Sequence, residues 1–125
     1  MHTHNLKTVF FHLDKDEKSD IYMLQLTEGP TAIFAAELKA GKKLPAHFHN
    51  QGAEVYQILS GNGTFELGQV AYGQVIWEEC LQVKEGDLFE VQAGRVHRLS
   101  GGREDLRLLF ITPPAHLGED RTFIE

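Results

Sequence analysis

Two histidines, His47 and His49, stand two residues apart in the middle of this 125-residue chain. In an extended strand alternate side chains point to the same face, so both imidazoles would project together. Their Cα atoms would lie roughly 6–7 Å apart, and two imidazoles at that spacing can reach one ion at a metal–nitrogen distance of about 2.0–2.1 Å. Glu54 can add an oxygen ligand from the next strand, and His97 is a fourth candidate downstream.

These four side chains would be costly to bury without a cation. A buried polar group without a partner costs roughly 1–3 kcal/mol, whereas a divalent ion takes the imidazole lone pairs and neutralises the carboxylate. Three imidazoles and one carboxylate leave one or two positions open for water, dioxygen or substrate on a five- or six-coordinate ion. Iron, manganese, nickel, copper and zinc all accept this ligand set, so the identity of the metal stays open.

The spacing around these residues resembles the two motifs of the cupin superfamily. The first, G-x5-H-x-H-x(3,4)-E-x6-G, is matched at every fixed position, namely Gly41, His47, His49, Glu54 and Gly61. The second, G-x5-P-x-G-x2-H-x3-N, is matched at Gly86, Gly94 and His97. Gln92 replaces the proline and Gly101 replaces the asparagine, and neither departure removes a ligand. The resemblance covers residues 41–101 and implies that His47, His49, Glu54 and His97 bind one metal ion.

Short apolar runs separated by Gly, Pro, Asn and Asp predict an all-β protein with an antiparallel double-sheet jelly roll. The cupin resemblance implies the same fold, a double-stranded β-helix barrel. Besides the histidine strand, the segments expected to form strands are 7–13, 21–26, 31–38, 54–59, 64–67, 75–83, 88–91, 96–99 and 106–112. The segments expected outside strands are a solvated charged loop at 14–20, a hairpin loop at 68–73 and a polar tail at 115–125 that covers a sheet edge.

Length and composition predict one cupin domain over residues 1–125, frayed at 1–6, with no room for an appended DNA-binding domain. The net charge of −6 disfavours nucleic acid and anionic membranes as partners. No apolar run approaches the roughly 20 residues of a membrane span, and the N-terminus does not resemble a signal peptide. Cys80 is the single cysteine, so no disulfide can form within the chain, which fits a cytoplasmic location. Its side chain is expected to be a packed small one.

Other side chains are weaker candidates. Tyr56 shares a face with Glu54 and is the candidate catalytic residue, because its hydroxyl can donate a proton or hydrogen bond to a bound ligand; the alternative is a packed aromatic. Phe34 and Trp77 are either pocket walls or core. Arg95, before His97, either meets an anionic substrate or lies on the surface.

The remaining histidines lie outside both motifs. His12 and His116 are expected to be surface or structural residues. His2 and His4 repeat the H-x-H spacing in the terminus expected to fray, where they would bind only adventitious metal.

The predicted metal site and the cupin resemblance are compatible with two functions. The first is a small metal-dependent enzyme that acts on a small molecule, of the dioxygenase, isomerase or decarboxylase type found among cupins. The second is a non-catalytic module in which the metal anchors a sugar or another small ligand. The apolar segment Val9-Phe10-Phe11 is too hydrophobic for an exposed edge and suggests a homodimer.

Overall fold

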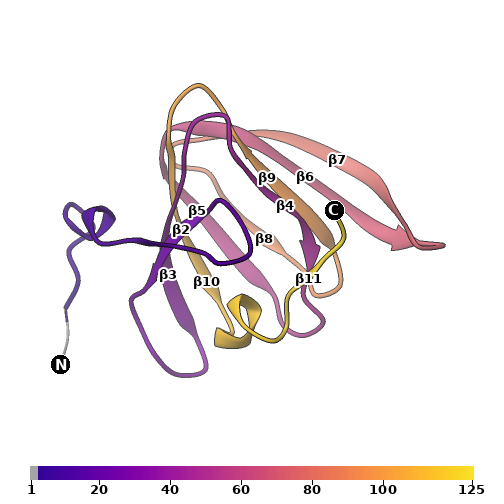
Figure 1. Cartoon of the computed structure of the whole chain (residues 1–125), viewed down its shortest axis with the longest axis horizontal. Helices are drawn as coiled ribbons and strands as arrows, with labels where there is room; N and C mark the ends of the chain where they lie inside the picture. Colours follow the sequence, from indigo (N-terminus) through magenta and orange to yellow (C-terminus); the bar gives the residue numbers. More distant parts are fainter. Residues whose placement is uncertain (1–2) are drawn as a thin grey trace.

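Eleven β-strands and two short 3-10 helices run through the computed structural model, which describes residues 3–125 (Figure 1). In chain order the elements are η1 (Val9–Phe11), β1 (Asp14–Lys15), β2 (Tyr22–Gln25), β3 (Ala32–Leu38), β4 (Lys43–Phe48), β5 (Glu54–Ser60), β6 (Asn62–Ala71), β7 (Gln74–Lys84), β8 (Leu88–Val91), β9 (Val96–Gly101), β10 (Leu106–Thr112), η2 (Pro114–Leu117) and β11 (Thr122–Phe123). Neither of the helical segments in this part of the chain has the length and apolar character that a membrane crossing requires.

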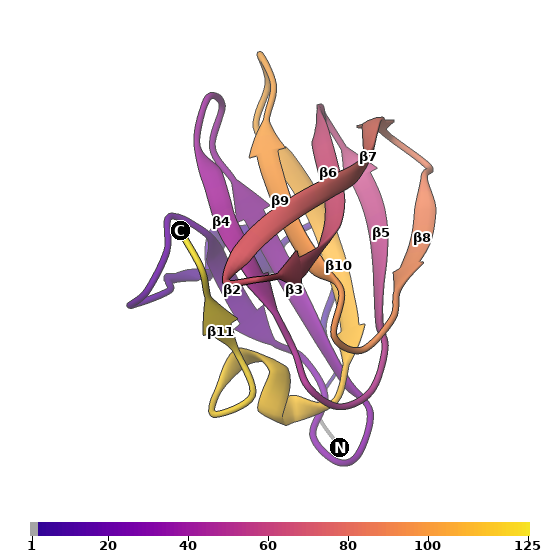
Figure 2. The ribbon, with the colours of Figure 1, turned by 90° about the vertical axis from the view of Figure 1, so that its right-hand side faces the viewer.

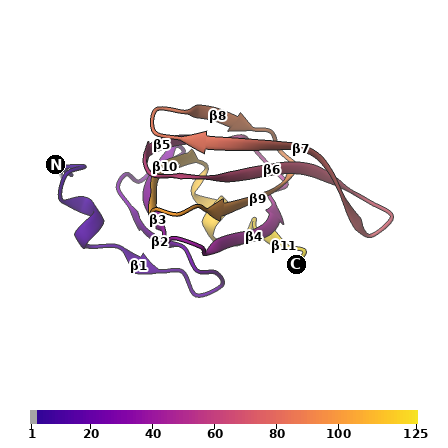
Figure 3. The same cartoon turned by 90° about the horizontal axis from the view of Figure 1, so that it is seen from above.

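The strands form two antiparallel sheets that face each other (Figure 3). One sheet has the order β1-β2-β3-β10-β5-β8 and the other the order β11-β4-β9-β6-β7. From β3 to β10 the chain passes repeatedly from one sheet to the other, so strands distant in sequence become neighbours. This arrangement is a jelly roll, and the predicted fold class is confirmed.

The core lies between the sheets and follows the two-residue period of the strands. Ala32, Phe34, Ala36 and Leu38 are all buried, as the alternation in this segment predicts. β10 repeats the pattern, with buried and half-buried residues alternating over its whole length. Phe34 belongs to this core and therefore serves packing, one of its two expected roles.

The charged segment 14–20 is not the solvated loop that the sequence predicts. Asp14 and Lys15 pair with β2, and Asp16 and Ser19 are buried. Asp16 is buried because its carboxylate accepts two hydrogen bonds from Arg121, far along the chain. A charge run identifies a solvated loop only when no distant partner exists for one of its charges.

Two further local predictions are wrong. Segment 7–13 forms the 3-10 helix η1 instead of a strand. Segment 68–73 is not a loop, because β6 continues to Ala71 and turns only at Tyr72 and Gly73. The strand survives Gly68 because the register shifts there, and a Cβ at Gly68 would lie 2.3 Å from the carbonyl oxygen of Ile76.

The C-terminal tail, residues 113–125, packs against one end of the barrel (Figure 2). β11 pairs with β4 at the edge of the second sheet, as predicted for residues 115–125. Arg98 and Lys43 both form ion pairs with Glu125 near its end. These contacts hold the tail beside the histidine strand.

Candidate metal centre

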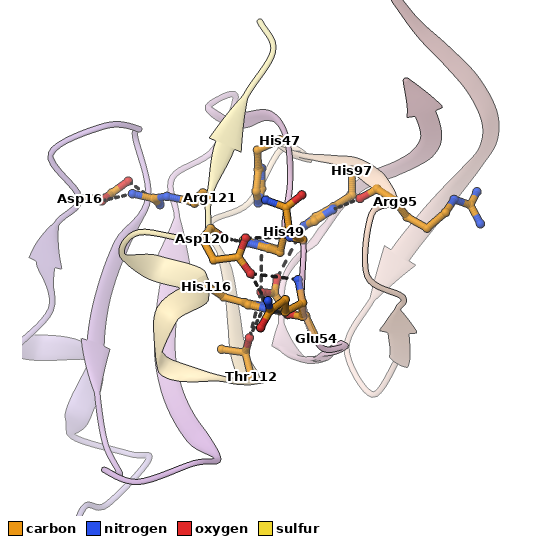
Figure 4. A network of polar contacts seen from close by, with 12 residues as sticks. Asp16, His47, His49, Glu54, Arg95, His97, Thr112, His116, Asp120 and Arg121 are labelled. Atoms are coloured by element: carbon orange, nitrogen blue, oxygen red, sulfur yellow. Dashed lines mark hydrogen bonds and ion pairs between the residues drawn. The ribbon is translucent and has the colours of Figure 1, made fainter. Parts of the chain in front are cut away.

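Four side chains from three strands and one adjoining loop converge inside the barrel (Figure 4). His47 lies in β4 opposite His97 of β9, His49 follows the end of β4, and Glu54 begins β5. Their nearest ligand atoms all lie within 4.8 Å of one another, and no side chain is more than 3% exposed. The structure therefore brings together the four residues that the motifs single out.

Backbone carbonyls fix the orientation of the three imidazoles. The Nδ1 atoms of His47, His49 and His97 lie 2.8, 2.6 and 3.0 Å from the carbonyl oxygens of Pro45, Asp120 and Arg95, respectively. A carbonyl oxygen can only accept, so each Nδ1 carries the hydrogen and donates it. In a neutral ring the lone pair then resides on Nε2, the atom left to face the centre of the cluster.

Two of the three inward nitrogen atoms, those of His49 and His97, lack the partners that buried polar atoms normally have in the described part of the chain. Nε2 of His49 lies 3.2 Å from Oε2 of Glu54, and Nε2 of His97 lies 3.6 Å from Oε1. Neither nitrogen forms a hydrogen bond with any residue of the described range 3–125. Lone pairs pointed at a carboxylate repel it unless a cation lies between them, so this donor set fits a divalent metal.

The protonation states also suit a metal. Burial, aided by the nearby charge of His97, lowers the pKa of His47 to about 3. Burial alone would raise the pKa of Glu54, but the contact with His116 and the neighbouring imidazoles of His49 and His97 hold it well below its usual range. At neutral pH the cluster therefore presents a neutral His47 and an ionised Glu54, the forms that bind metals.

A fifth histidine lies against this cluster although the motifs do not include it. His116, from η2, is 1% exposed, and its ring stacks on that of His49 at 4.0 Å with an interplanar angle of 2°. Its Nε2–H donates to the carbonyl oxygen of Gln51, and its Nδ1 lies 2.5 Å from Oγ1 of Thr112 and 3.1 Å from Oε2 of Glu54. His116 was expected to be either a surface or a structural residue, and its burial shows that the surface alternative is wrong.

His116 has an acidic environment. Burial lowers its pKa, but the hydrogen bonds to Glu54 and to the Gln51 carbonyl outweigh burial and raise the pKa above the usual value. No spacing in the sequence links His116 to either motif, so only the tertiary contacts reveal its position.

Asp120 ties the tail to the same site. Its carboxylate accepts hydrogen bonds from the backbone N–H groups of Asn50 at 2.7 Å and Gln51 at 3.0 Å, while its carbonyl orients His49. These contacts fix the loop that follows β4. A surface pocket of about 520 Å³ lies where the tail meets this loop. It is lined by Asn50, Gln51, Gly52, Pro113, Ala115, His116, Glu119 and Asp120.

The comparisons with known proteins agree with this geometry. Residues 34–112 match the family model of the cupin domain. The chain belongs to the cupin family. No curated protein matches it.

Solved structures share the cupin's fold at low sequence identity. The cupin domain of Schizosaccharomyces pombe Cnp3 has a TM-score of 0.73 at 18% identity and covers 89% of this chain and 72% of its own. An uncharacterized conserved protein with a double-stranded β-helix domain from Klebsiella pneumoniae has a TM-score of 0.70 at 17% identity and covers 99% of both chains. A predicted oxalate decarboxylase from Thermotoga maritima has a TM-score of 0.63 at 21% identity and covers 82% of this chain and 90% of its own. Likeness at these identities establishes the fold alone.

Tyr56 of this cupin points into the core near Glu54. It is fully buried and packs on the rings of Phe65, Phe89 and Phe110, with centroids 4.8–5.4 Å away. Its hydroxyl has no hydrogen-bond partner in the described part of the chain. Burial, together with the charge of Glu54, raises its pKa well above the usual value, so the phenol keeps its proton. Donation of that proton or of a hydrogen bond to a ligand remains a prediction.

The other candidates lie outside the cluster. Arg95 points away from it (Figure 4) and bonds to the Gly68 carbonyl and to Glu78, so the surface role is the one observed. Trp77 is neither core nor pocket wall, because it is half-buried and its ring packs under the guanidinium of Arg98 at 4.5 Å. Arg98 has this outward direction because the residues on either side of it in β9 face the interior.

Cys80 is exposed, so the expectation of a packed side chain is wrong. It lies in β7, an edge strand whose side chains are mostly exposed. His4 and His12 are also exposed, as expected, and His2 lies outside the described residues.

Proposed function

We propose that this cupin binds one divalent transition metal through His47, His49, Glu54 and His97 and acts as a small metal-dependent enzyme on a small molecule. The observation that carries the proposal is that the buried Nε2 atoms of His49 and His97, which have no hydrogen-bond partner among residues 3–125, are directed at the ionised Glu54 carboxylate. On a five- or six-coordinate ion, four ligands from protein side chains leave one or two positions open, which is the arrangement of a reactive site.

When bound, the metal would supply Lewis-acid activation of a substrate oxygen or a binding centre for dioxygen. The chain's own residues do the rest: backbone carbonyls hold the rings in one tautomer, and the apolar core beneath the cluster excludes water. Tyr56 is the proposed donor to a bound ligand, because its hydroxyl is protonated, buried and without a hydrogen-bond partner among residues 3–125. The reaction classes under proposal are dioxygenase, isomerase and decarboxylase, and one structural neighbour is described as a predicted oxalate decarboxylase.

A non-catalytic binding module is the second candidate. All four metal-binding side chains are 3% exposed or less, and several ion pairs hold the C-terminal tail over them. Such a closed site favours retention of a bound small molecule over its rapid exchange. A screen of the metal-loaded protein for oxygen consumption and for conversion of small acids and sugars separates the two. Tight binding without turnover would select the module.

The metal site itself is tested by His49→Ala. Loss of one imidazole from the set should lower metal content after dialysis by about tenfold or more, measured by elemental analysis against protein concentration. His12→Ala, which removes an exposed histidine, is the matched control and should leave metal content unchanged. Equal occupancy in the two variants would refute the site. The same analysis identifies the metal among iron, manganese, nickel, copper and zinc.

We also propose that the protein is a cytoplasmic homodimer. Phe11 is 77% exposed and Leu6 is 43% exposed at the N-terminal end, an apolar surface that a second copy can cover. The exposed free thiol of Cys80 is compatible with a reducing compartment. Sedimentation of the wild type and of Phe11→Ser tests the dimer, which the substitution should weaken.

A further inference from the structure

The C-terminal tail, residues 113–125, covers one side of the four-residue cluster (Figure 4). The ring of Phe123 lies 5.4 Å from that of His47, and the carbonyl oxygen of Asp120 accepts the hydrogen bond from Nδ1 of His49. All four side chains of the cluster are 3% exposed or less. A metal ion or a small molecule therefore reaches the cluster only when some part of the surrounding structure moves away.

The tail is held to the sheets by a shorter strand ladder than the other elements around the cluster. β5 and β9, which carry Glu54 and His97, each pair with a strand on both sides. β11 pairs over only two residues, and within the described range 3–125 it lies at the edge of its sheet beside β4. Local opening occurs where the fewest backbone and buried contacts have to break, so the tail is the element expected to move.

Side-chain contacts supply most of the remaining attachment of the tail. They are the ion pairs of Arg121 with Asp16 and of Glu125 with Arg98 and Lys43. None of these side chains belongs to the cluster, so the strength of the attachment can be changed without replacement of a candidate metal ligand.

The surface pocket of about 520 Å³ lies along the boundary between the tail and the loop that follows β4. His116 of the tail lines this pocket, and its ring also stacks on that of His49 at 4.0 Å. The pocket and the cluster therefore lie on two sides of one side chain. Displacement of the tail would join them, which makes this boundary the shortest route from solvent to the cluster.

We propose that the tail is a gate: it opens to admit a metal ion or a small molecule and, when closed, holds His49 in its binding orientation. This inference rests on the metal site proposed above. Closure brings the Asp120 carbonyl to Nδ1 of His49 and the Asp120 carboxylate to the N–H groups of Asn50 and Gln51. Opening removes these contacts, so the closed tail and the bound metal stabilise each other.

A disulfide between the tail and the barrel tests the gate. Thr122 of β11 lies opposite Phe48 of β4, and opposite residues of antiparallel strands have Cα atoms about 4.5–5.5 Å apart, a separation that a disulfide spans. Both side chains point away from the cluster, because they alternate with Phe123 and His47 along their strands. The full-length variant carries Thr122→Cys and Phe48→Cys in a Cys80→Ser background. Its reduced form is the matched control for its oxidised form, because only the crosslink differs.

Both forms are loaded with Zn²⁺, and the release of the ion to an excess of a colorimetric chelator is followed. The oxidised form should release Zn²⁺ about tenfold or more slowly than the reduced form, because the crosslink keeps the tail closed. The Cys80→Ser background alone should release Zn²⁺ at one rate under both redox conditions. Equal rates for the oxidised and reduced forms overturn the gate and leave the metal site standing. A wild type that binds no Zn²⁺ overturns the proposed function and this inference with it.

A second pair of variants tests the gate if the cysteine variant does not fold or does not form the crosslink. Glu125→Ala removes the ion pairs with Arg98 and Lys43 and should release Zn²⁺ about threefold or more faster than the wild type. Glu78→Ala removes the ion pair with Arg95, which does not involve the tail, and should leave the release rate unchanged. Equal release rates in these two variants also overturn the gate.

Discussion

Replacement of Arg121 by methionine should destabilise the protein strongly. Arg121 is 3% exposed and Asp16 is 7% exposed at their side chains, and two hydrogen bonds of 3.0 Å join them. Methionine has a similar length and no charge, so the substitution keeps most of the packing and leaves the Asp16 carboxylate buried without its cation. The perturbation therefore isolates the ion pair that ties segment 14–20 to the C-terminal tail.

The expected magnitude follows from the burial of the pair. Removal of one partner of a buried ion pair costs about 3–5 kcal/mol, because the remaining charge is uncompensated. Asp16 keeps the hydrogen bond from Ser19 at 2.7 Å, so the lower end, about 3 kcal/mol, applies here. For a domain of this size, 1 kcal/mol lowers Tm by about 3–5 °C. Arg121→Met should therefore lower Tm by about 10 °C or more.

Thermal and urea unfolding followed by circular dichroism measure the effect. Arg103→Met is the matched control, because Arg103 is exposed and its loss should change stability by no more than about 0.5 kcal/mol. The double variant Asp16→Asn with Arg121→Met should recover part of the loss, since it removes the unpaired charge. A Tm for Arg121→Met within about 2 °C of wild type would refute the reasoning, because the pair would then contribute no more than an exposed one.

Three further predictions concern pH, a glycine and Tyr56. Asp16→Asn should lower Tm above about pH 4, and the difference should vanish on acidification. Burial raises the pKa of Asp16, but the hydrogen bonds from Arg121 and Ser19 outweigh burial and hold the pKa below its usual value, so protonation at low pH removes the contribution of the carboxylate; Tm against pH checks this. Gly61→Ala should cost about 1–3 kcal/mol more than Gly73→Ala in urea unfolding, because both glycines have positive φ but only at Gly61 would a Cβ meet a backbone oxygen, that of Asp105 at 2.2 Å. Tyr56→Phe should leave metal content and Tm unchanged or raise Tm, because no residue of the described part of the chain bonds to the buried hydroxyl, and it should lower turnover if the hydroxyl donates to the substrate.

The part of the fold that rests on local pattern was predictable from the sequence. Segment 106–112 coincides with β10, and the alternation at Ala32, Phe34, Ala36 and Leu38 places one face inside, because a strand repeats every two residues whatever surrounds it. The prediction of a loop at 68–73 was wrong because glycine is typical of turns, whereas Gly68 lies at a bulge where two backbones approach each other.

The candidate site also has a part that the sequence predicts and a part that it does not. The two motifs identify His47, His49, Glu54 and His97 as one set, and the fold that they imply brings the side chains together, with His97 of β9 opposite His47 of β4. The site's outer contacts were not predictable. Nothing near His116 in the sequence indicates that its ring would reach Glu54.

The sequence by itself determined the strand pattern, the family and the identity of the four inward side chains, because each depends on residues close together in the chain or on a motif. Only the tertiary structure decided which nitrogen of His49 faces inward, that Thr112 and His116 contact Glu54, and that Arg121 neutralises Asp16. Those outcomes depend on partners 58 to 105 residues away, such as the Asp120 carbonyl, which lies 71 residues from His49. Such contacts form only when the tail closes against the barrel, and a linear pattern does not encode that distance.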